Sequence, residues 1–372
     1  MILNCDWLQL FCDLKDFRMC PEYTYERLTA SSNVFSELLE IYQGRRKLAM
    51  IAMKPYSPII DKHSGLVKII NSCLYAEDCS EVVSQLLSRH HIRPKSLSRV
   101  DIAGDFVSLP GYPDPEKLIR DILMEKVVRV GRGKGQASGK QGRRRAEHEP
   151  FAAIWNHDVD KGLSYEYLRF GKRSSNVAVY MYDKTVEMQE VTRKPYIVDK
   201  WRRNGLVEGD RHVWRLEFSL KPAELELVVN GFDHLLYDWH SYLFEHTLAM
   251  IYYSVADKYF RLVDPTTATR ITRCKPLKII LPTTPIGELS EKTTDSHSDR
   301  SMRVFLGKLS KVNDELRTEQ QSVRMMSQYL VKHYAADTDL QEWASQRGIN
   351  LTEVPTEQDI INALADVVDR RK

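Results

Sequence analysis

Alternation of apolar and polar residues in three short stretches constrains the fold of this chain more than any other feature. The stretches are "RVDIAGDF" (99–106), "NVAVYMYDK" (176–184) and "VWRLEFSLK" (213–221). Successive side chains of a β-strand point to opposite faces, so each stretch predicts a strand with one apolar and one polar face. The segment "SYEYLRFGKRSSNVAVYMY" (164–182) predicts a hairpin that turns at "GKRSS". Together these features predict an α+β fold with an antiparallel-sheet core.

The chain of 372 residues divides into three predicted regions. Residues 1–283 form the predicted sheet domain, which would carry the catalytic site. Residues 284–301 are polar and rich in Ser and Thr, which is typical of a linker. Residues 302–372 are predicted to form a helical C-terminal region. Within the first region, helices are expected at 79–92, 115–127 and 234–263.

The composition is that of an ordinary soluble globular protein, with 42% hydrophobic and 28% charged residues. No apolar run reaches the ~18–20 residues needed to cross a bilayer. The N-terminus lacks the basic start, apolar core and cleavage site of a signal peptide. Six cysteines form no CxxC pair and no zinc-binding spacing, which predicts reduced thiols. We therefore expect a cytoplasmic protein with no membrane partner.

Positive charge is concentrated in one loop. The net charge is +3, yet "RVGRGKGQASGKQGRRR" (129–145) contains seven Lys or Arg and no acid. This predicts a basic loop over 129–149 that contacts nucleic-acid phosphates. Its "GRGKGQ" lacks the ending and the strand-then-helix context of a nucleotide-binding loop. The predicted DNA contacts are Arg143, Arg144 and Arg145 of this loop, Lys172 and Arg173 of the hairpin turn, and Arg215.

Strand parity places several polar side chains on shared faces. Asp101 and Asp105 share one face of their strand, and Glu217 shares a face with Arg215. Taken singly, solvent-facing acids and a structural tyrosine explain each strand as well as a site does. Antiparallel neighbours would, however, bring these acids and a tyrosine hydroxyl to one point.

Such a cluster predicts phosphodiester chemistry. Carboxylate oxygens are ligands for Mg²⁺ or Mn²⁺, which would polarise the phosphate and neutralise developing charge. A tyrosine hydroxyl has a free pKa of about 10 and needs activation to act as a nucleophile. Tyr180, Tyr182 and Lys184 share one face of the third strand. Lys184 is predicted either to lower the tyrosine pKa or to hold a phosphate oxygen.

Four motifs follow one another in a recognisable order. They are "CDWLQL" (5–10), "RVDIAGDF" (99–106), "RFGKRSSNVAVYMYDK" (169–184) and "WRLEFSLK" (214–221). In these motifs the sequence resembles the replication initiation factor family. That family includes rolling-circle plasmid initiators, filamentous-phage replication proteins and relaxases of integrative conjugative elements. The resemblance implies a sheet related to the palm of HUH endonucleases, a divalent metal held mainly by acids, and a tyrosine that nicks origin DNA.

The resemblance also assigns residues. Asp105 and Glu217 are expected to be the main metal ligands, followed by Asp101. Tyr182 occupies the tyrosine position of the "YDK" motif and is the expected nucleophile. Some relatives carry a second tyrosine three residues later, where this chain has Thr185. That candidate is therefore absent, and Tyr180 is the remaining rival.

The expected function is that of a rolling-circle replication initiator or relaxase with a 5′-phosphotyrosyl intermediate. Its DNA would be an origin, single-stranded or extruded as a hairpin, of a plasmid, phage or conjugative element in a bacterial cell. The alternative is a non-catalytic, sequence-specific DNA-binding protein on the same scaffold. A third hypothesis is a metal nuclease that uses water and leaves no adduct. The C-terminal helices are candidates for contacts with origin DNA, a host helicase or a second copy of the chain.

Overall fold

The computed structural model describes most of residues 1–291. The described ranges are 1–29, 34–56, 60–130, 151–158, 162–171, 175–190, 193–207, 211–228, 236–270, 273–279 and 288–291, together with residue 356. Most of the predicted basic loop and the predicted helical region 302–372, apart from residue 356, lie outside them. The predicted DNA contacts Lys172, Arg173, Arg143, Arg144 and Arg145 also lie outside the described residues.

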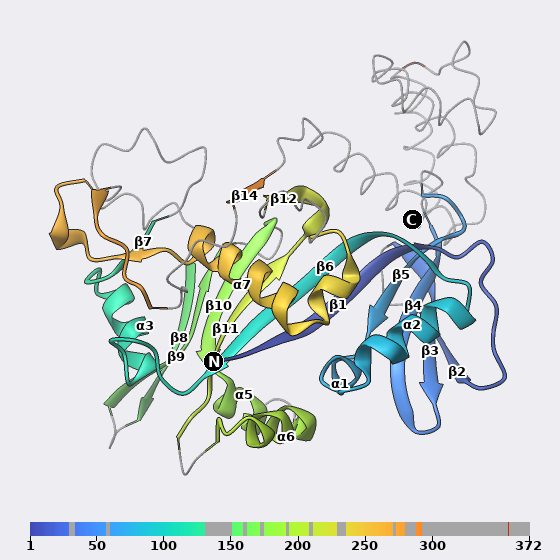
Figure 1. The fold of residues 1–372 in the computed structure, drawn as a ribbon, viewed down its shortest axis with the longest axis horizontal. Helices are drawn as coiled ribbons and strands as arrows, with labels where there is room; N and C mark the ends of the chain where they lie inside the picture. The colour runs from blue at the N-terminus through green and yellow to red at the C-terminus, as the bar shows by residue number, and fades with distance from the viewer. Residues whose placement is uncertain are drawn as a thin grey trace, which may run out of the picture. The chain divides into compact units, whose positions relative to one another are not determined.

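A ten-stranded sheet forms the framework of the described chain (Figure 1), in the order β2-β3-β4-β5-β1-β6-β11-β10-β9-β8. Its strands are β1 (Ile2–Asp13), β2 (Thr24–Thr29), β3 (Phe35–Gln43), β4 (Arg46–Pro55), β5 (Ser64–Ile69), β6 (Arg93–Phe106), β8 (Phe151–Asp158), β9 (Gly162–Phe170), β10 (Val177–Asp183) and β11 (Trp214–Leu220). The pairs from β1 through β6, β11, β10 and β9 to β8 are all antiparallel. The predicted antiparallel core and the β9–β10 hairpin are therefore confirmed.

Two small sheets accompany the large one. β12 (Leu225–Val228) pairs with β14 (Glu288–Glu291), and β13 (Leu262–Val263) pairs with β7 (Val128–Arg129). Strand β14 lies inside the segment predicted to be a linker. Its Leu289 is buried and stands opposite the buried Leu227. Burial of Leu289 next to Leu227 anchors this short strand in a sheet, although the segment around it is mostly polar.

The chain divides into two compact units. The first contains Met1–Thr24, Ile41–Met50 and Leu66–Thr293, and the second contains Tyr25–Glu40, Ile51–Gly65 and Thr294–Lys372. All residues of the candidate site described below belong to the first unit.

The helices agree in part with the sequence predictions. They are α1 (Asn71–Leu74), α2 (Cys79–Arg89), α3 (Pro115–Leu123), α5 (Lys184–Glu190), α6 (Pro195–Arg203) and α7 (Glu245–Tyr259), with 3-10 turns η1 (Pro222–Glu224), η2 (Trp239–Tyr242) and η3 (Pro265–Thr267). Helix α3 begins at Pro115, and the Asp114 side chain accepts a hydrogen bond from the backbone N–H of Glu116. This arrangement satisfies a free donor of the first turn. None of the described helices is long and apolar enough to span a membrane.

The helix predicted over 234–263 is shorter than expected. It runs only from Glu245 to Tyr259, and a separate 3-10 turn at Trp239–Tyr242 precedes it. The carboxylate of Asp238 accepts a hydrogen bond from the N–H of His240, which starts this turn. Asp competes with a continuous helix in this way, because its side chain bonds to nearby backbone donors.

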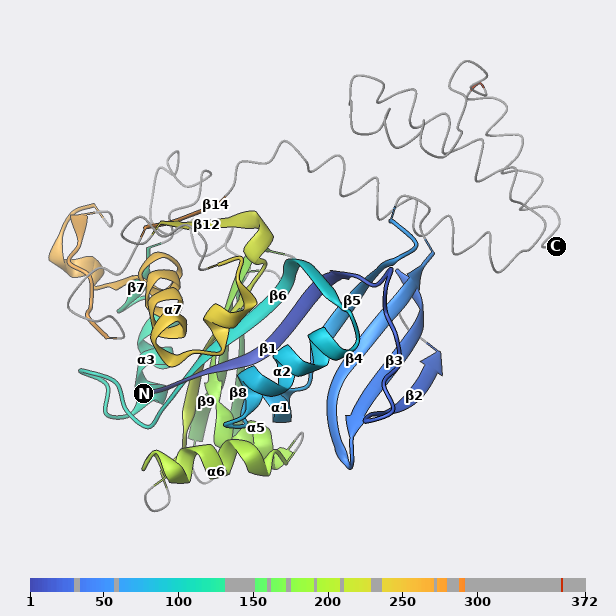
Figure 2. The same cartoon turned by 45° about the vertical axis from the view of Figure 1, so that its right-hand side comes forward.

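Helix α7 covers the apolar face of the central strands (Figure 1). The ring of Tyr252 packs edge-on against Phe218 at 5.2 Å, and its hydroxyl donates to the carbonyl of Leu216 at 3.2 Å. Gly104 of β6 makes this close approach feasible, since a Cβ there would lie 2.5 Å from the Tyr252 hydroxyl. The polar face of β6 and β11 points away from α7. Helices α5 and α6 lie next to each other at one end of the sheet (Figure 2).

Candidate active site

Three adjacent strands present the predicted polar side chains on one face. In the pairing of β6, β11 and β10, Arg215 stands between Asp105 and Tyr182. Glu217, two residues further along β11, stands opposite Tyr180 and Ala103. The common face predicted from strand parity is therefore present. The strand register shows, in addition, which of these residues stand directly opposite one another.

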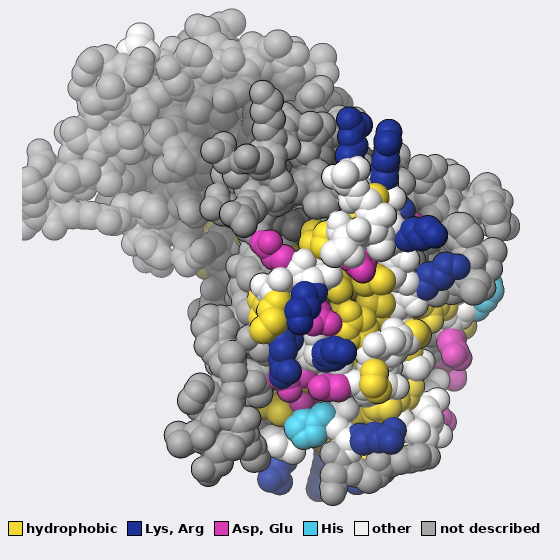
Figure 3. Space-filling model, turned by 90° about the vertical axis from the view of Figure 1, so that its left-hand side faces the viewer, with side chains coloured by type: hydrophobic (Ala, Val, Ile, Leu, Met, Phe, Trp, Pro, Cys, Tyr) yellow, Lys and Arg dark blue, Asp and Glu magenta, His cyan; other side chains and the backbone are white. Residues whose placement is uncertain are grey.

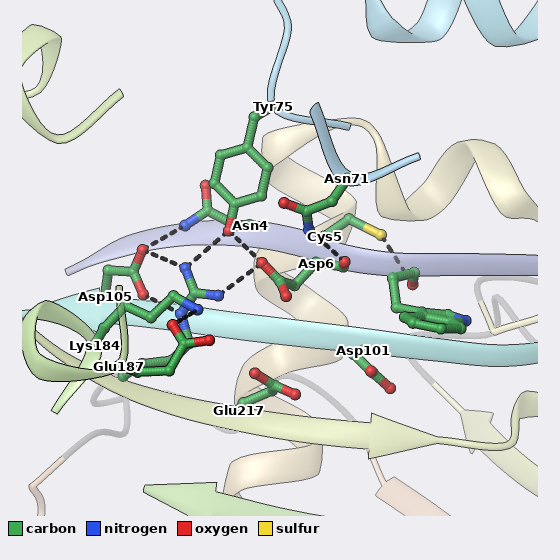
Figure 4. A network of polar contacts seen from close by, with 12 residues as sticks. Asn4, Cys5, Asp6, Asn71, Tyr75, Asp101, Asp105, Lys184, Glu187 and Glu217 are labelled. Atoms are coloured by element: carbon green, nitrogen blue, oxygen red, sulfur yellow. Dashed lines mark hydrogen bonds and ion pairs between the residues drawn. The ribbon is translucent and has the colours of Figure 1, made fainter. Parts of the chain in front are cut away.

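A fully buried ion pair between Asp105 and Arg215 closes one end of this face (Figure 4). The Nε of Arg215 lies 2.6 Å from Oδ1 of Asp105, and its Nη2 lies 2.9 Å from Oδ2. The same Oδ2 also accepts hydrogen bonds from the Asn4 amide at 3.1 Å and from the Trp201 indole N–H at 2.8 Å. Asp105 thus accepts four hydrogen bonds within the protein.

These contacts involve two residues with predicted roles. Asp105 was expected to bind metal and Arg215 to contact DNA; the two form an ion pair in the interior, and both roles stay predictions. A buried guanidinium needs a carboxylate partner, since removing either charge leaves the other without compensation. Among the described residues, no group of three or more His, Cys, Asp or Glu side chains is arranged to hold a metal ion.

Asp6 and Tyr75 complete the closed end, although sequence reasoning assigned neither a role. Nη1 of Arg215 lies 2.7 Å from Oδ1 of Asp6, and the Tyr75 hydroxyl donates to the same oxygen at 2.7 Å. Nη2 of Arg215 donates to the Tyr75 oxygen at 2.8 Å. Burial acts to raise the pKa of Asp6, but Arg215 and Lys184 outweigh it and hold that pKa well below its usual range.

Asp6 has the same strand parity as Asn4 and so lies on this face, and an irregularity of β1 brings Trp7 to the same face directly after it. The pairing of β1 with β6 shifts between Cys5 and Trp7, so Asp6 is an extra residue of the strand. Such a bulge breaks the alternation of side chains and re-aims one of them. The "CDWLQL" motif marks the segment, but its pattern carries no sign of the bulge.

Tyr182 and Glu217 form the other, more open end of the site. The Tyr182 hydroxyl donates to Oε2 of Glu217 at 2.8 Å. Burial, Asp6 and Asp101 raise the pKa of Glu217 to about 7, while Arg215 and the hydrogen bond act in the opposite direction. Burial and the nearby Glu217 raise the pKa of Tyr182 well above its ordinary value. The pair is a phenol that already points its proton at a carboxylate titrating near neutrality.

The rival tyrosine lies beside this pair. Tyr180 is partly buried, and its pKa is raised by burial and by Glu217 and Asp101. The ring of Tyr167 on β9 lies 6.3 Å from the ring of Tyr180 and 6.4 Å from that of Tyr182. An aromatic group of three tyrosines therefore borders the site on the side of β9 and β10.

Lys184 lies close to Tyr182 but does not have the predicted effect on its hydroxyl. This lysine is buried at the start of α5, and its Nζ forms an ion pair with Oε2 of Glu187 at 2.7 Å. The ammonium lies 5.4 Å from the centre of the Tyr182 ring. The pKa of Tyr182 is raised rather than lowered. A contact of Lys184 with a phosphate oxygen stays a prediction.

Asp101 is the remaining predicted metal ligand. Its carboxylate is buried and forms two hydrogen bonds with Arg99, from Nε at 2.9 Å and from Nη2 at 2.6 Å. Burial nevertheless raises its pKa. Asp101 and Glu217 are thus two carboxylates on neighbouring strands whose ionisation the surroundings oppose. Two carboxylates suit a Mg²⁺ ion that completes its coordination with water and phosphate oxygens, rather than an all-protein cage.

One face of the described surface mixes charges of both signs. On the face shown in Figure 3, Lys and Arg side chains lie among acidic and hydrophobic ones. With the basic loop outside the described residues, the predicted loop contacts with DNA stay predictions.

Comparisons with known proteins give a weak structural likeness and no sequence match. No protein-family model and no curated protein matches the sequence. One solved structure, described as a rolling circle replication initiator protein from Geobacillus stearothermophilus, aligns with a TM-score of 0.42 and 14% sequence identity. The alignment covers 74% of this chain and 92% of that chain. A likeness at this level carries no argument about function, and the function proposed for this protein follows from the geometry of its site.

Proposed function

We propose that this protein nicks and rejoins a DNA strand through Tyr182, as a rolling-circle replication initiator or relaxase would. The observation that carries the proposal is the 2.8 Å hydrogen bond from the Tyr182 hydroxyl to Glu217. A nucleophile whose proton already points at a carboxylate with a pKa of about 7 meets the requirement for general-base activation at neutral pH. The proposal also takes the sheet to be related to the HUH palm.

In the proposed reaction, the Tyr182 oxygen attacks a DNA phosphorus atom while Glu217 accepts the phenolic proton. The bond from phosphorus to the 3′ oxygen breaks, and water protonates the departing oxygen. The products are a 5′-phosphotyrosyl bond and a free 3′-hydroxyl, and protonated Glu217 neutralises the hydroxide. Rejoining reverses these steps, so no external energy source is needed.

The closed end would position the reacting pair. Arg215 and Glu217 are neighbours on the polar face of β11. Asp105 and Asp6 hold the Arg215 guanidinium from two sides. Arg215 acts to lower the pKa of Glu217, which burial would otherwise raise further. We assign Arg215 a positioning role, because its polar atoms are occupied within the protein.

Metal dependence is part of the proposal: Asp101 and Oε1 of Glu217 would hold the ion, while Oε2, which accepts the Tyr182 hydrogen bond, would take the proton. A bound Mg²⁺ or Mn²⁺ would polarise the phosphodiester and neutralise charge in the transition state. The protein would act in the bacterial cytoplasm on origin DNA. A helicase contact or a homodimer through the C-terminal helices remains a further prediction.

One observation favours the alternative of a non-catalytic DNA-binding protein. The pKa of Tyr182 is raised, mainly by burial, so the phenol strongly retains its proton. A structural tyrosine that satisfies a partly buried glutamate would have the same geometry. The two functions differ in whether a covalent protein–DNA bond forms.

The test is a search for that covalent bond. Labelled single-stranded oligonucleotides from the DNA that encodes the protein would be incubated with it, in Mn²⁺, in Mg²⁺ and in chelator. Denaturing electrophoresis would then detect a band that survives boiling in detergent. The wild type should form the adduct with metal, Tyr182→Phe should not, and the matched control Tyr180→Phe should.

The other results have distinct meanings. Loss of the adduct only in Tyr180→Phe would keep the function and reassign the nucleophile. Cleavage without an adduct would identify a nuclease that uses water. Binding without cleavage to an oligonucleotide that contains the origin would establish the non-catalytic alternative.

A further inference from the structure

A cluster of two cationic side chains and a tryptophan lies on the same face of the sheet as the candidate site, on the neighbouring strands β5, β1 and β6. Nζ of Lys68 on β5 lies 3.2 Å from the centre of the Trp7 ring on β1. The guanidinium carbon of Arg99 on β6 lies 4.5 Å from the same centre. β1 is flanked by β5 and β6 in the sheet, so two cations from different strands converge on one indole. The Trp7 N–H donates to Gln9 at 3.2 Å, which helps to fix the ring.

Positive charge is in excess at this point. Among the described residues, Lys68 forms no ion pair with a carboxylate, whereas Arg99 pairs with Asp101. Burial and then the charge of Arg99 lower the pKa of Lys68 to about 8; Asp101 acts in the opposite direction, and Lys47 and Lys194 add smaller lowering effects. A cluster in which cations repel one another gains stability when an anion binds.

The cations remain accessible to a ligand. The Arg99 side chain is 43% exposed, and Lys68 and Trp7 are partly buried. Contacts with the indole hold the two side chains in place without neutralising them, since a cation–π contact at such a site contributes only about 0.5–1 kcal/mol. The arrangement therefore orders two charges in advance and leaves their hydrogen-bond donors available in part.

The position of the cluster relates it to Tyr182 and Glu217. Ala103 stands opposite Glu217, and Arg99 lies four residues from Ala103 along β6, or about 13 Å at the rise of a strand. The Arg99 side chain folds back to Asp101, which brings its guanidinium closer. Tyr180, which stands opposite Glu217 on β10, adds a partly buried aromatic ring that is influenced by the charge of Arg99.

We propose that Lys68 and Arg99, ordered against Trp7, bind a backbone phosphate of the single strand whose scissile phosphate lies at Tyr182. The site is a phosphate subsite on the polar face of the sheet and rests on the proposed DNA-nicking function. A polymer is the expected ligand, because the cations and the reacting pair lie along one face at a spacing that a few nucleotides cover. Aromatic rings interleaved with cations are the pattern by which proteins hold single strands.

The experiment measures binding separately from chemistry. Full-length Tyr182→Phe protein, which forms no adduct, would be titrated onto a fluorescein-labelled oligothymidylate and followed by anisotropy over a range of salt concentrations. Adding Lys68→Gln should weaken binding about ten-fold, as expected for loss of one charged contact. It should also reduce the slope of log K against log salt by about 0.7, which corresponds to one phosphate on a single strand.

Two matched variants make the result specific. Lys15→Gln removes an exposed lysine in the turn after β1 and should leave affinity and slope unchanged. Lys68→Arg keeps the charge and should restore most of the slope. Thermal melting of each variant verifies that it is folded. An unchanged slope in folded Lys68→Gln would overturn the proposal, as would the same loss in Lys15→Gln.

A competition arm distinguishes a DNA strand from a free anion. Inorganic phosphate at millimolar concentration should displace little of the oligonucleotide. Its complete displacement of the Lys68-dependent binding would assign the site to a small phosphate and overturn the proposal. The nicking function has its own readout in wild-type protein. If wild-type protein forms the adduct but Lys68→Gln leaves binding unchanged, only the subsite is refuted. If Lys68→Gln weakens binding but wild-type protein forms no adduct, only the nicking function is refuted.

Discussion

The two ends of the polar face differ in how their charges are balanced. At the closed end, Asp105 and Asp6 both bind Arg215, and the pKa of Asp6 is held well below its usual range. At the open end, none of the described cations forms an ion pair with Glu217, and its pKa is raised to about 7. The closed end stabilises the ionised form of Asp6, and the open end opposes the ionisation of Glu217. This difference separates a part that holds the strands together from a part suited to move a proton.

The largest effect is expected at Asp105. Asp105→Asn would leave the Arg215 guanidinium buried with only Asp6 as an anionic partner, and we expect a loss of about 3–5 kcal/mol in the free energy of unfolding. Urea denaturation would measure it. The control is Asp78→Asn, because Asp78 forms a 2.8 Å ion pair with Arg46 at the surface. Its loss should be at most about 1 kcal/mol. Equal losses for the two variants would refute the claim that the closed end is a structural clamp.

A smaller loss is expected at Asp6. Asp6→Asn should cost about 1.5–3 kcal/mol at neutral pH, since the charged hydrogen bond to Arg215 is weakened while Asp105 remains. The folded pKa of Asp6 is lowered, so its contribution is complete above the unfolded pKa and disappears as pH falls through the folded value. The stability difference between wild type and variant should therefore begin to shrink below pH 3.8, the ordinary value, and should vanish only as pH falls through the lower folded pKa. A constant difference down to strong acid would contradict this assignment.

The smallest effect, and one of opposite sign, is expected at Glu217. Its folded pKa is raised from 4.5 to about 7, so wild-type stability should fall as pH rises through this window. Glu217→Gln removes the ionising group and should stabilise the protein at pH 8 by about 1–3 kcal/mol. The same variant should form no DNA adduct. A destabilised Glu217→Gln at pH 8 would show that the glutamate serves structure rather than chemistry.

Much of the framework follows from the sequence. The alternation in "RVDIAGDF", "NVAVYMYDK" and "VWRLEFSLK" predicts three strands, and β6, β10 and β11 confirm them. Their polar faces coincide because antiparallel neighbours keep side-chain parity. The break before α7 was missed, since the apolar and aromatic residues of 234–263 fit helical spacing while the Asp238 side chain caps a separate 3-10 turn ahead of the helix.

The site could be predicted only in part. Parity brings Asp105, Arg215 and Tyr182 to one face, but it does not show that Asp105 and Arg215 stand directly opposite each other and form an ion pair. Asp6 lies on a strand whose pairing with β6 the sequence does not specify, and no residue pattern announces the bulge that brings Trp7 to the same face. Tyr75 and Trp201 come from outside the strands, and only three-dimensional packing shows which strand residue they contact.

The place of β11 in the sheet has a consequence for how the protein is made. β11 is the last of the ten strands in chain order, yet it lies between β6 and β10. During synthesis, β1 and β6 can pair early and β8, β9 and β10 can pair later, but neither group can join the other until β11 has left the ribosome. Asp105 cannot form its ion pair until Arg215, 110 residues further along the chain, has been synthesised. The nascent protein therefore exposes an open strand edge and an uncompensated acid, and it gains its reacting pair only when this last strand closes the sheet.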